Sequence, residues 1–334
     1  DSVQPNWNEN TGSINNKPDW LPEVVTQLST EIVTRINAAA SLNAINLTAL
    51  VLLSTQRQSM DAKVLANLMT LFSDLIKSMP YSETMSFVEG DGAEWLKYAE
   101  QMGLVERQSN KLGDIIALRD RNAILLTYNR NNILHFFAVP ALIASLTQNN
   151  NRIKKSKVHQ LFRSIYPYIR AELFLQWNSD QIDEIFDGWL AILIENKLIG
   201  IDGEYIVRPG IGSGLFVKLS VLARFIMPTL ERYYIAIAVL TRHGAGKVDA
   251  AQLEEESTQM AERMSILFGL NAPEFFDKSL FRNFIETMKD KSVVFEDEQG
   301  KLGFDKQVSQ VADDSKLVLN AELRQAILQV TSLQ

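Results

Sequence analysis

Residues 124–144 read ILLTYNRNNILHFFAVPALIA and combine the most polar and the most apolar parts of this sequence. The short apolar run Ile124–Thr127 is rich in strand-forming residues and predicts a β-strand. It is followed at once by the polar segment Tyr128–Asn132 and then by the mostly apolar run Ile133–Leu146. We expect these residues to join several elements of the fold, because polar groups between two apolar runs need partners.

The candidate functional residues lie in this stretch: Tyr128, Arg130, Asn131, Asn132 and His135. Burying a guanidinium group or an amide without hydrogen bonds costs several kcal/mol, roughly 2–7 for an amide. One hypothesis is that Arg130 and the amides cap helix ends and bind backbone carbonyls. The other is that they face a separate domain and brace it or its substrate cleft.

The spacing of apolar residues and turn residues predicts a mainly α fold with short β-hairpins. Two helices are followed by a hairpin in a first unit, with strands expected at 104–105, 115–118 and 124–127. The same order recurs with a hairpin at 198–207, where Asp202-Gly203 is a strong turn signal, and again at 293–304. We therefore predict helical domains built from two or three winged-helix-like units.

The same patterns predict the division of the chain. It comprises a polar leader over residues 1–19, a first winged-helix-like unit over 20–147, an Asn-rich and basic linker over 148–157, and a second helical region over 158–334 with one or two further units. The tail is expected to end in a helix after residue 317.

Composition limits the classes of function. The chain has 334 residues, 46% of them hydrophobic, and a formal net charge of −7, which argues against nucleic-acid binding because that depends on neutralising phosphates. It has no cysteine and only three isolated histidines, so we expect neither a disulfide nor a metal site. No window of eighteen apolar residues is present, and no transmembrane helix is expected.

The basic side chains of the predicted linker are candidate contacts to an anionic membrane surface: Arg152, Lys154, Lys155 and Lys157. Each such charge contributes on the order of 1 kcal/mol near an anionic leaflet. The adjacent Phe136 and Phe137 are candidates for shallow insertion. The alternative is a solvated linker next to aromatic residues of the core. The acidic run Glu254–Glu256 is interpreted as a solvated helix face.

The motif Leu-Leu-Thr-Tyr-x-Arg-Asn-Asn-Ile-x-His, followed by Pro-x-Leu-Ile-Ala, resembles the C-terminal region of the bacterial membrane-bound glycerol-3-phosphate acyltransferases. Four other segments resemble this family in the same order: Ile36–Ala40 with Asn46–Arg57, Pro80–Ser82, Pro228–Tyr233, and Ala272–Lys278. Together they extend from about residue 20 to about residue 290.

The resemblance implies a parent enzyme that transfers an acyl group from acyl carrier protein or acyl-CoA to the 1-hydroxyl of glycerol 3-phosphate, without a cofactor. It would be a peripheral protein at the cytoplasmic face of the bacterial inner membrane. The family's His-x-x-x-x-Asp box is absent, since residues 140, 164 and 248 are Pro, Ser and Val. Its phosphate-binding box Phe-Pro-Glu-Gly-Thr-Arg-Ser is matched only by Phe87–Gly92, which has Gly92 in the position of the arginine.

We therefore expect this chain to be a non-catalytic accessory region, inactive alone, that braces an acyltransferase domain upstream of Asp1 and has a possible role in membrane association. The alternative hypothesis is a tandem winged-helix protein that binds nucleic acid or serves as a scaffold. The net negative charge argues against it, and so we expect no nucleic-acid partner.

Overall fold

The computed structural model describes residues 7–8, 13–14, 18–55, 57–119, 122–268, 276–304, 308, 317–319 and 324–327. Most of the leader and most of the predicted tail helix lie outside these residues. The helices are α1 (Leu21–Ala38), α2 (Ala44–Leu53), α3 (Ala62–Ser78), α4 (Gly92–Gln101), α5 (Ala123–Gln148), α6 (Lys155–Leu173), α7 (Ile182–Glu195), α8 (Gly214–Arg224), α9 (Met227–His243), α10 (Ala250–Phe268) and α11 (Lys278–Asp290). The predicted fold class, mainly helical with short strand pairs, is confirmed.

The strands are short and lie in small separate sheets. They are β1 (Trp7–Asn8), β2 (Ser13–Ile14), β3 (Ser41–Leu42), β4 (Ser59–Asp61), β5 (Ser86–Phe87), β6 (Val105–Gln108), β7 (Ile115–Leu118), β8 (Arg152–Lys154), β9 (Gly200–Asp202), β10 (Tyr205–Val207), β11 (Val294–Glu296) and β12 (Leu302–Phe304). β3 and β5 pair in parallel, whereas the other pairs are antiparallel.

Two three-stranded sheets have the same topology. In the first, β4 precedes α3 and α4, and the hairpin β6–β7 follows them, with the strand order β4-β7-β6. In the second, β8 precedes α6 and α7, the hairpin β9–β10 follows, and the order is β8-β10-β9. The repetition of element order is therefore present in the structure, while the assignment of these units as winged helices stays a prediction.

The C-terminal hairpin β11–β12 completes a similar arrangement after α10 and α11. The residues before α10 approach the hairpin, since Gly246 N donates to Leu302 O at 2.9 Å and Leu302 N donates to Val248 O at 2.7 Å. This segment thus occupies the place that β4 and β8 occupy in the other two units.

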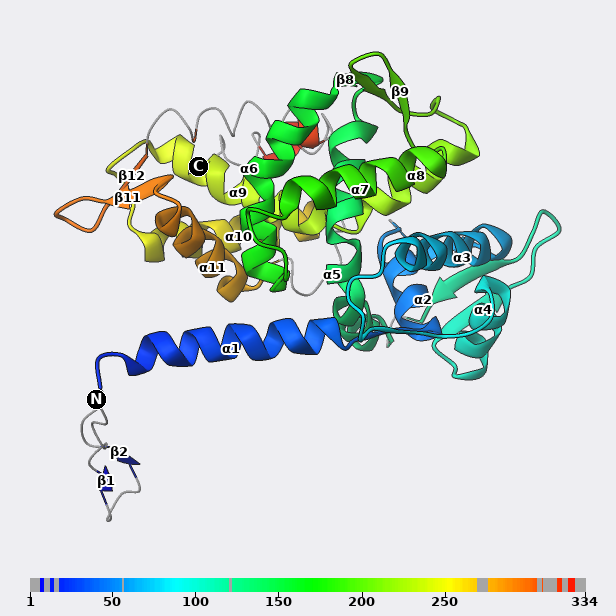
Figure 1. Ribbon diagram of the computed structural model, residues 1–334, viewed down its shortest axis with the longest axis horizontal. Helices are drawn as coiled ribbons and strands as arrows, with labels where there is room; N and C mark the ends of the chain where they lie inside the picture. The colour runs from blue at the N-terminus through cyan, green and yellow to red at the C-terminus, as the bar shows by residue number, and fades with distance from the viewer. Residues whose placement is uncertain are drawn as a thin grey trace.

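Helix α5 runs through the middle of the molecule (Figure 1), with α2–α4 on one side and α6 and α9–α11 on the other, while α8 lies above α3. It packs against α2, α6, α7 and α8, and its residues Ile133–Thr147 are all buried. A helix that is apolar on all sides is expected to be surrounded by other elements. The core is one continuous hydrophobic cluster that includes residues from α2 to α11.

The predicted strand at Ile124–Thr127 is wrong, because these residues form the first turns of α5. A short apolar run has no periodicity that separates a strand from a buried helix. The helix also continues through Pro140, which cannot donate a backbone hydrogen bond. Phe136 and Phe137 are buried in the core and do not form an exposed apolar surface.

The segment predicted as a linker, 148–157, is only partly a connection. Arg152–Lys154 forms β8, which pairs with β10 so that Ile153 lies opposite Ile206, and α6 begins at Lys155. Both isoleucines are buried. The linker residues after position 151 therefore belong to the sheet and helix of the second unit.

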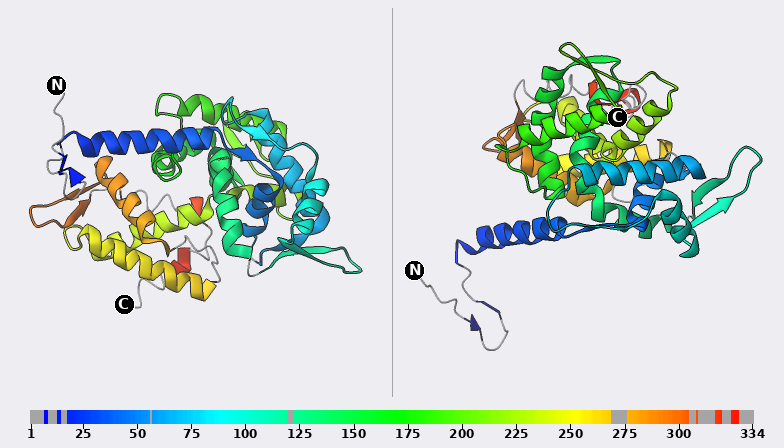
Figure 2. Two further views of the ribbon diagram at one scale, coloured as in Figure 1. Left: turned by 90° about the horizontal axis from the view of Figure 1, so that it is seen from below. Right: turned by 45° about the vertical axis from the view of Figure 1, so that its right-hand side comes forward.

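Helix α1 lies apart from the rest of the fold. It extends beneath the other helices, and only its C-terminal end approaches them (Figures 1 and 2). No residue of α1 is buried, and the segment Pro22–Ile32 is exposed throughout. Among the described residues, none of the helices combines the length and the apolar character that crossing a bilayer requires.

Candidate interdomain site at the start of α5

The structure separates the five candidate residues into two groups on α5. Tyr128, Asn131 and Asn132 are exposed, whereas Arg130 and His135 are buried. The division follows from the helix, in which consecutive side chains point about 100° apart. None of these residues is the N-cap of α5, because all lie inside the helix and its N-cap is Asn122. The hypothesis that Arg130 and the amides cap helix ends and bind backbone carbonyls stays a prediction.

Arg130 lies on the buried side of α5. Its Nε and Nη2 atoms donate to Asn131 Oδ1 at 3.1 and 2.9 Å, which links the buried guanidinium to an exposed amide. Burial, and secondarily the positive charge of Arg232, lower the pKa of Arg130 to about 10. The side chain remains charged at neutral pH, and two arginines from α5 and α9 thus share this part of the core.

A buried ionic cluster joins α6 to α9 beside Arg130. Arg232 Nη2 donates to Glu172 Oε1 and, at 3.0 Å, to Thr229 Oγ1. Thr229 Oγ1 donates to the same carboxylate oxygen at 3.0 Å, and Tyr233 OH donates to Glu172 Oε2 at 3.0 Å. Burial and the negative charge of Glu172 raise the pKa of Tyr233 well above its usual value, which keeps this hydroxyl group protonated as a donor.

Sequence reasoning missed this cluster as a site. Thr229, Arg232 and Tyr233 lie in one of the segments that carry the family resemblance, but Glu172 comes from a helix that had no such signal. The spacing of Thr229 and Arg232 places both on one face of a helix. This shared face was the one signal in the sequence that these two side chains could belong to the same cluster.

His135 connects α5 to the end of α1. Its Nε2 lies 2.9 Å from Asn37 O, and Asn37 Nδ2 donates to Leu173 O at 2.9 Å. The ring packs edge-on against Tyr81 and contacts Phe136. Burial lowers the pKa of His135 to about 4, against the opposing effect of the hydrogen bond to the Asn37 carbonyl. The ring is therefore neutral near pH 7, and Nε2 carries the proton that it donates.

The loop before β5 closes the same junction. Ser82 Oγ and Thr84 Oγ1 both donate to Ala38 O, the latter at 2.9 Å. Gln176 N donates to Tyr81 OH at 3.0 Å, and Gln176 Nε2 donates to Tyr81 O. The ends of α1 and α6, this loop and α5 thus meet around His135, and we call these contacts the α1 junction. It brings together residues from three of the segments that carry the resemblance.

The other two histidines lie within hydrogen-bond distance of carboxylates. His159 Nε2 lies 2.8 Å from Asp183 Oδ1, and Arg163 binds the second oxygen of that carboxylate at 3.0 Å. His243 Nε2 lies 2.6 Å from Glu256 Oε2, to which Arg242 also donates at 3.1 Å. Each carboxylate is shared between a histidine and an arginine, and these contacts join α6 to α7 and α9 to α10.

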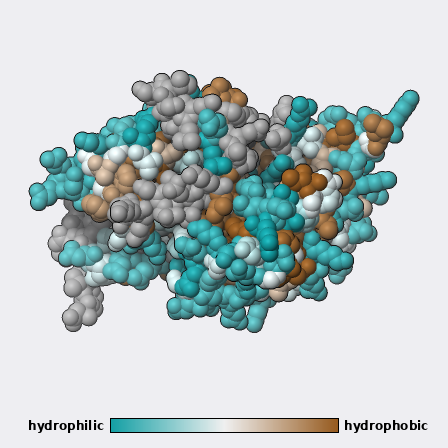
Figure 3. Space-filling view, turned by 90° about the horizontal axis from the view of Figure 1, so that it is seen from above, coloured by the Kyte–Doolittle hydropathy of each residue, from teal (hydrophilic) through white to brown (hydrophobic). Residues whose placement is uncertain are grey.

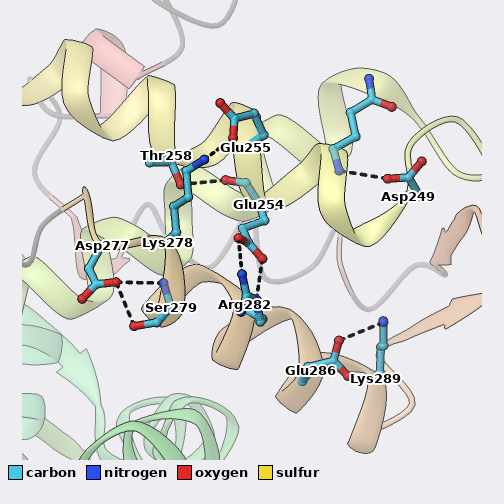
Figure 4. A network of polar contacts seen from close by, with 11 residues as sticks. Asp249, Glu254, Glu255, Thr258, Asp277, Lys278, Ser279, Arg282, Glu286 and Lys289 are labelled. Atoms are coloured by element: carbon cyan, nitrogen blue, oxygen red, sulfur yellow. Dashed lines mark hydrogen bonds and ion pairs between the residues drawn. The ribbon is translucent and has the colours of Figure 1, made fainter.

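The acidic run in α10 was interpreted as a solvated face; Glu255 is exposed as expected, whereas Glu254 and Glu256 are partly buried. Arg282 binds Glu254 through two hydrogen bonds of 2.8 Å, and Lys278 binds Glu255 (Figure 4). Glu256 binds His243. These carboxylates join α10 to α11 and α9, because the helices pack so that opposite charges face one another.

Arg152, Lys154 and Lys155, which were proposed for membrane contact, are paired with carboxylates. Arg152 binds Asp202 at 3.0 Å, Lys154 binds Glu204 at 3.3 Å, and Lys155 binds Asp187 at 2.9 Å. The Arg152 guanidinium also lies 3.9 Å from the centre of the Tyr205 ring. The positive charges of Arg152, Lys154 and Lys155 are thus largely compensated. The role of these residues and of Lys157 at a membrane stays a prediction.

The residues described by the structure include no group of three or more His, Cys, Asp or Glu side chains arranged to hold a metal ion. The upper face of the molecule is mostly polar, with apolar side chains in several small groups (Figure 3). The geometry at the start of α5 is therefore that of a polar junction, with an exposed edge formed by Tyr128, Asn131 and Asn132.

Comparison with known proteins finds relatives over almost the whole chain. The model of a family described as "Glycerol-3-phosphate acyltransferase C-terminal region" matches residues 1–297. This chain is also similar to three proteins named glycerol-3-phosphate acyltransferase. Over 331 residues it is 44% identical to the one from Pseudomonas aeruginosa (strain LESB58), 43% to the one from Pseudomonas putida (strain GB-1) and 42% to the one from Ectopseudomonas mendocina (strain ymp). These similarities cover 99% of this chain, which spans about 40% of the length of each relative.

Proposed function

Because this chain belongs to the glycerol-3-phosphate acyltransferase C-terminal region family, we propose that it is a non-catalytic accessory region that braces the acyltransferase part of a longer enzyme. The resemblance seen in the sequence is confirmed by the family match and by the relatives. The observation that carries the proposal is the extent of the match: nearly the whole chain aligns with the C-terminal region, yet it spans only about 40% of the relatives.

The parent reaction in this proposal is transfer of an acyl group from acyl carrier protein or acyl-CoA to the 1-hydroxyl of glycerol 3-phosphate. Such a transfer needs a general base for the hydroxyl proton. The His-x-x-x-x-Asp box that would supply it does not occur in these 334 residues. Two of the three histidines contact the carboxylates of Asp183 and Glu256, and burial keeps the third neutral and bonded to Asn37.

In this proposal the α1 junction sets the position of the acyltransferase part. His135 holds α5 against the end of α1 and Arg130 lies buried beside Arg232 of α9, while Tyr128, Asn131 and Asn132 present an exposed edge to the partner domain. The enzyme would act at the cytoplasmic face of the bacterial inner membrane, with Arg152, Lys154, Lys155 and Lys157 near the anionic lipid surface.

The proposal is tested by assaying the chain and the longer enzyme in parallel with glycerol 3-phosphate and either acyl donor. We expect turnover from the longer enzyme and none from the chain alone. In the longer enzyme, Arg130→Ala is expected to lower both turnover and melting temperature, because it removes the packing of a long buried side chain and its hydrogen bonds to Asn131. Thr30→Ala, an exposed substitution on α1, is the control.

Acyl transfer by the isolated chain would overturn the non-catalytic role. An Arg130→Ala enzyme with unaltered turnover and unaltered melting temperature would remove Arg130 from both the bracing and the structural role.

A further inference from the structure

Helix α1 carries an apolar stripe that the described part of the chain leaves uncovered. Val25, Leu28, Ile32 and Ile36 follow one another at helical spacing, and their exposed fractions are 51%, 57%, 49% and 63%. The hydrogen bonds between α1 and other elements come from its last turns, through Thr34, Asn37 and Ala38. A regular apolar stripe of this kind normally faces a packed partner.

The composition of α1 strengthens this argument. Eight of its 18 residues are β-branched, a class that loses side-chain freedom in a helix and has lower helix propensity. Its N-cap residue, Trp20, makes no capping hydrogen bond through its side chain. In proteins most helical stability comes from packing of an amphipathic face rather than from intrinsic propensity. The stability of α1 therefore depends on packing of its apolar stripe.

The apolar surface continues onto the first turns of α5. Ile124, Leu125 and Tyr128 are exposed by 63%, 53% and 68%. Tyr128 precedes His135 by seven residues, or about two turns, and so lies on the same face of α5 as His135, which binds the end of α1. The stripe of α1 and these three residues of α5 together form what we call the α1–α5 surface.

We propose that the α1–α5 surface is the docking site for an apolar surface of the acyltransferase part of the longer enzyme. This inference rests on the proposed function and names the surface through which the bracing occurs. The matching family describes a C-terminal region, and about 60% of each relative lies outside the match. Most of that remainder would enter at the N-terminal end of α1, where the connection gives it a high effective concentration.

The charges of α1 favour a protein partner over an anionic membrane. Helices that lie on membranes are rich in Lys and Arg on their polar face. The charged residues of α1 are Glu23, Glu31 and Arg35, and Arg35 is paired with Glu31. A helix with a net negative charge is repelled by anionic lipid, whereas an aliphatic stripe fits the apolar surface of a folded domain.

The test uses the absence of cysteine in this chain. Ile32→Cys places a single thiol on the stripe, and Thr30→Cys places one on the opposite face of the same helix. We expect maleimide to label both rapidly in the chain alone. In the longer enzyme, labelling is read from the α1 peptide by mass spectrometry. There we expect Ile32→Cys to react with maleimide about tenfold more slowly than in the chain alone, since a docked position reacts only when it opens.

A photo-crosslinking residue in place of Leu28 in the longer enzyme identifies the occupant. A crosslink to a peptide from the acyltransferase part supports the proposal, whereas a crosslink to a second copy of α1 or to lipid overturns it. Equal protection of Ile32→Cys and Thr30→Cys, or none at either position, also overturns it. These outcomes are independent of the acyl-transfer assay, so failure of the docking site and failure of the proposed function are distinguishable.

Discussion

Arg130 and His135 are five residues apart in the sequence and serve different contacts in the structure. Arg130 lies beside the buried pair of Glu172 and Arg232, whereas His135 binds the end of α1. The sequence grouped them with Tyr128, Asn131 and Asn132 by proximity along the chain. In a helix, neighbouring residues point in different directions, and so this group divides into buried anchors and an exposed edge.

The side chain of His135 predicts a specific dependence of stability on pH. Its pKa is lowered from an ordinary 6.5 to about 4 in the folded chain, so the unfolded state binds the proton more readily between these values. The stability from this group is fully present above pH 6.5 and is lost as the pH falls toward 4. Between pH 7.5 and 5 we expect a loss of about 2 kcal/mol.

Urea unfolding of wild type and His135→Gln at both pH values measures this contribution. The variant is expected to lose about 2 kcal/mol less than wild type on acidification, because its amide does not titrate. Asn132→Ala, an exposed substitution on the same helix, should keep the wild-type difference. An identical pH dependence in wild type and His135→Gln would contradict the assignment.

At the scale of elements, the contact between α3 and α4 depends on a single glycine. A Cβ atom on Gly92 would lie 1.9 Å from the backbone oxygen of Ala66, and Gly92 N donates to Thr70 Oγ1 at 2.8 Å. The N-terminus of α4 therefore lies directly against the backbone of α3. The Asp91 and Glu94 capping box fixes the start of α4 at this point.

We expect Gly92→Ala to destabilise the chain by about 3 kcal/mol, because neither backbone yields without separating the helices. Gly210→Ala is the matched control, since a Cβ atom there meets no other atom within 4 Å. Thermal or urea unfolding measures both. A Gly92→Ala variant as stable as the Gly210→Ala variant would show that α4 has freedom to move away from α3.

In both α1 and α5 the local sequence pattern differs from what the helix meets in the structure. In α1 the apolar residues Val25, Leu28, Ile32 and Ile36 recur at helical spacing, and this stripe is exposed within the described part of the chain. The stretch at the start of α5 combined a strand-like run with a polar segment, yet it forms part of a single helix of 26 residues. Local propensity is a weak prior when surrounding helices decide the outcome.

At the scale of the whole molecule, ion pairs limit the proposed membrane contact. Asp202 and Glu204 neutralise Arg152 and Lys154 on the hairpin of the second unit. If these basic residues face anionic lipid, removing their partners exposes two positive charges. At about 1 kcal/mol for each, Asp202→Asn with Glu204→Gln is expected to strengthen vesicle binding by about thirtyfold.

Co-sedimentation with vesicles that contain an anionic phospholipid measures this effect, and raising the salt concentration should weaken it. Glu298→Gln, in the turn of the C-terminal hairpin, is the control for an unrelated change of charge. Unchanged binding of the double variant would exclude this hairpin from the membrane contact.

The sequence by itself determined the helical class, both later hairpins and the family. These depend on periodicity, turn residues and motifs that are local in the chain, and the structure has strands at 200–202, 205–207, 294–296 and 302–304 as those patterns indicate. It also determined that the catalytic box of the family is absent, because that motif is defined by spacing alone.

Only the tertiary structure decided which side chains meet. The partners Glu172 and Arg232 are sixty residues apart, Asn37 and His135 are ninety-eight apart, and β8 joins a hairpin that forms some fifty residues later. Such contacts depend on how helices pack against α5, which no local pattern encodes. For the same reason, the periodicity of α1 alone does not show that its apolar stripe is exposed within the described part of this chain.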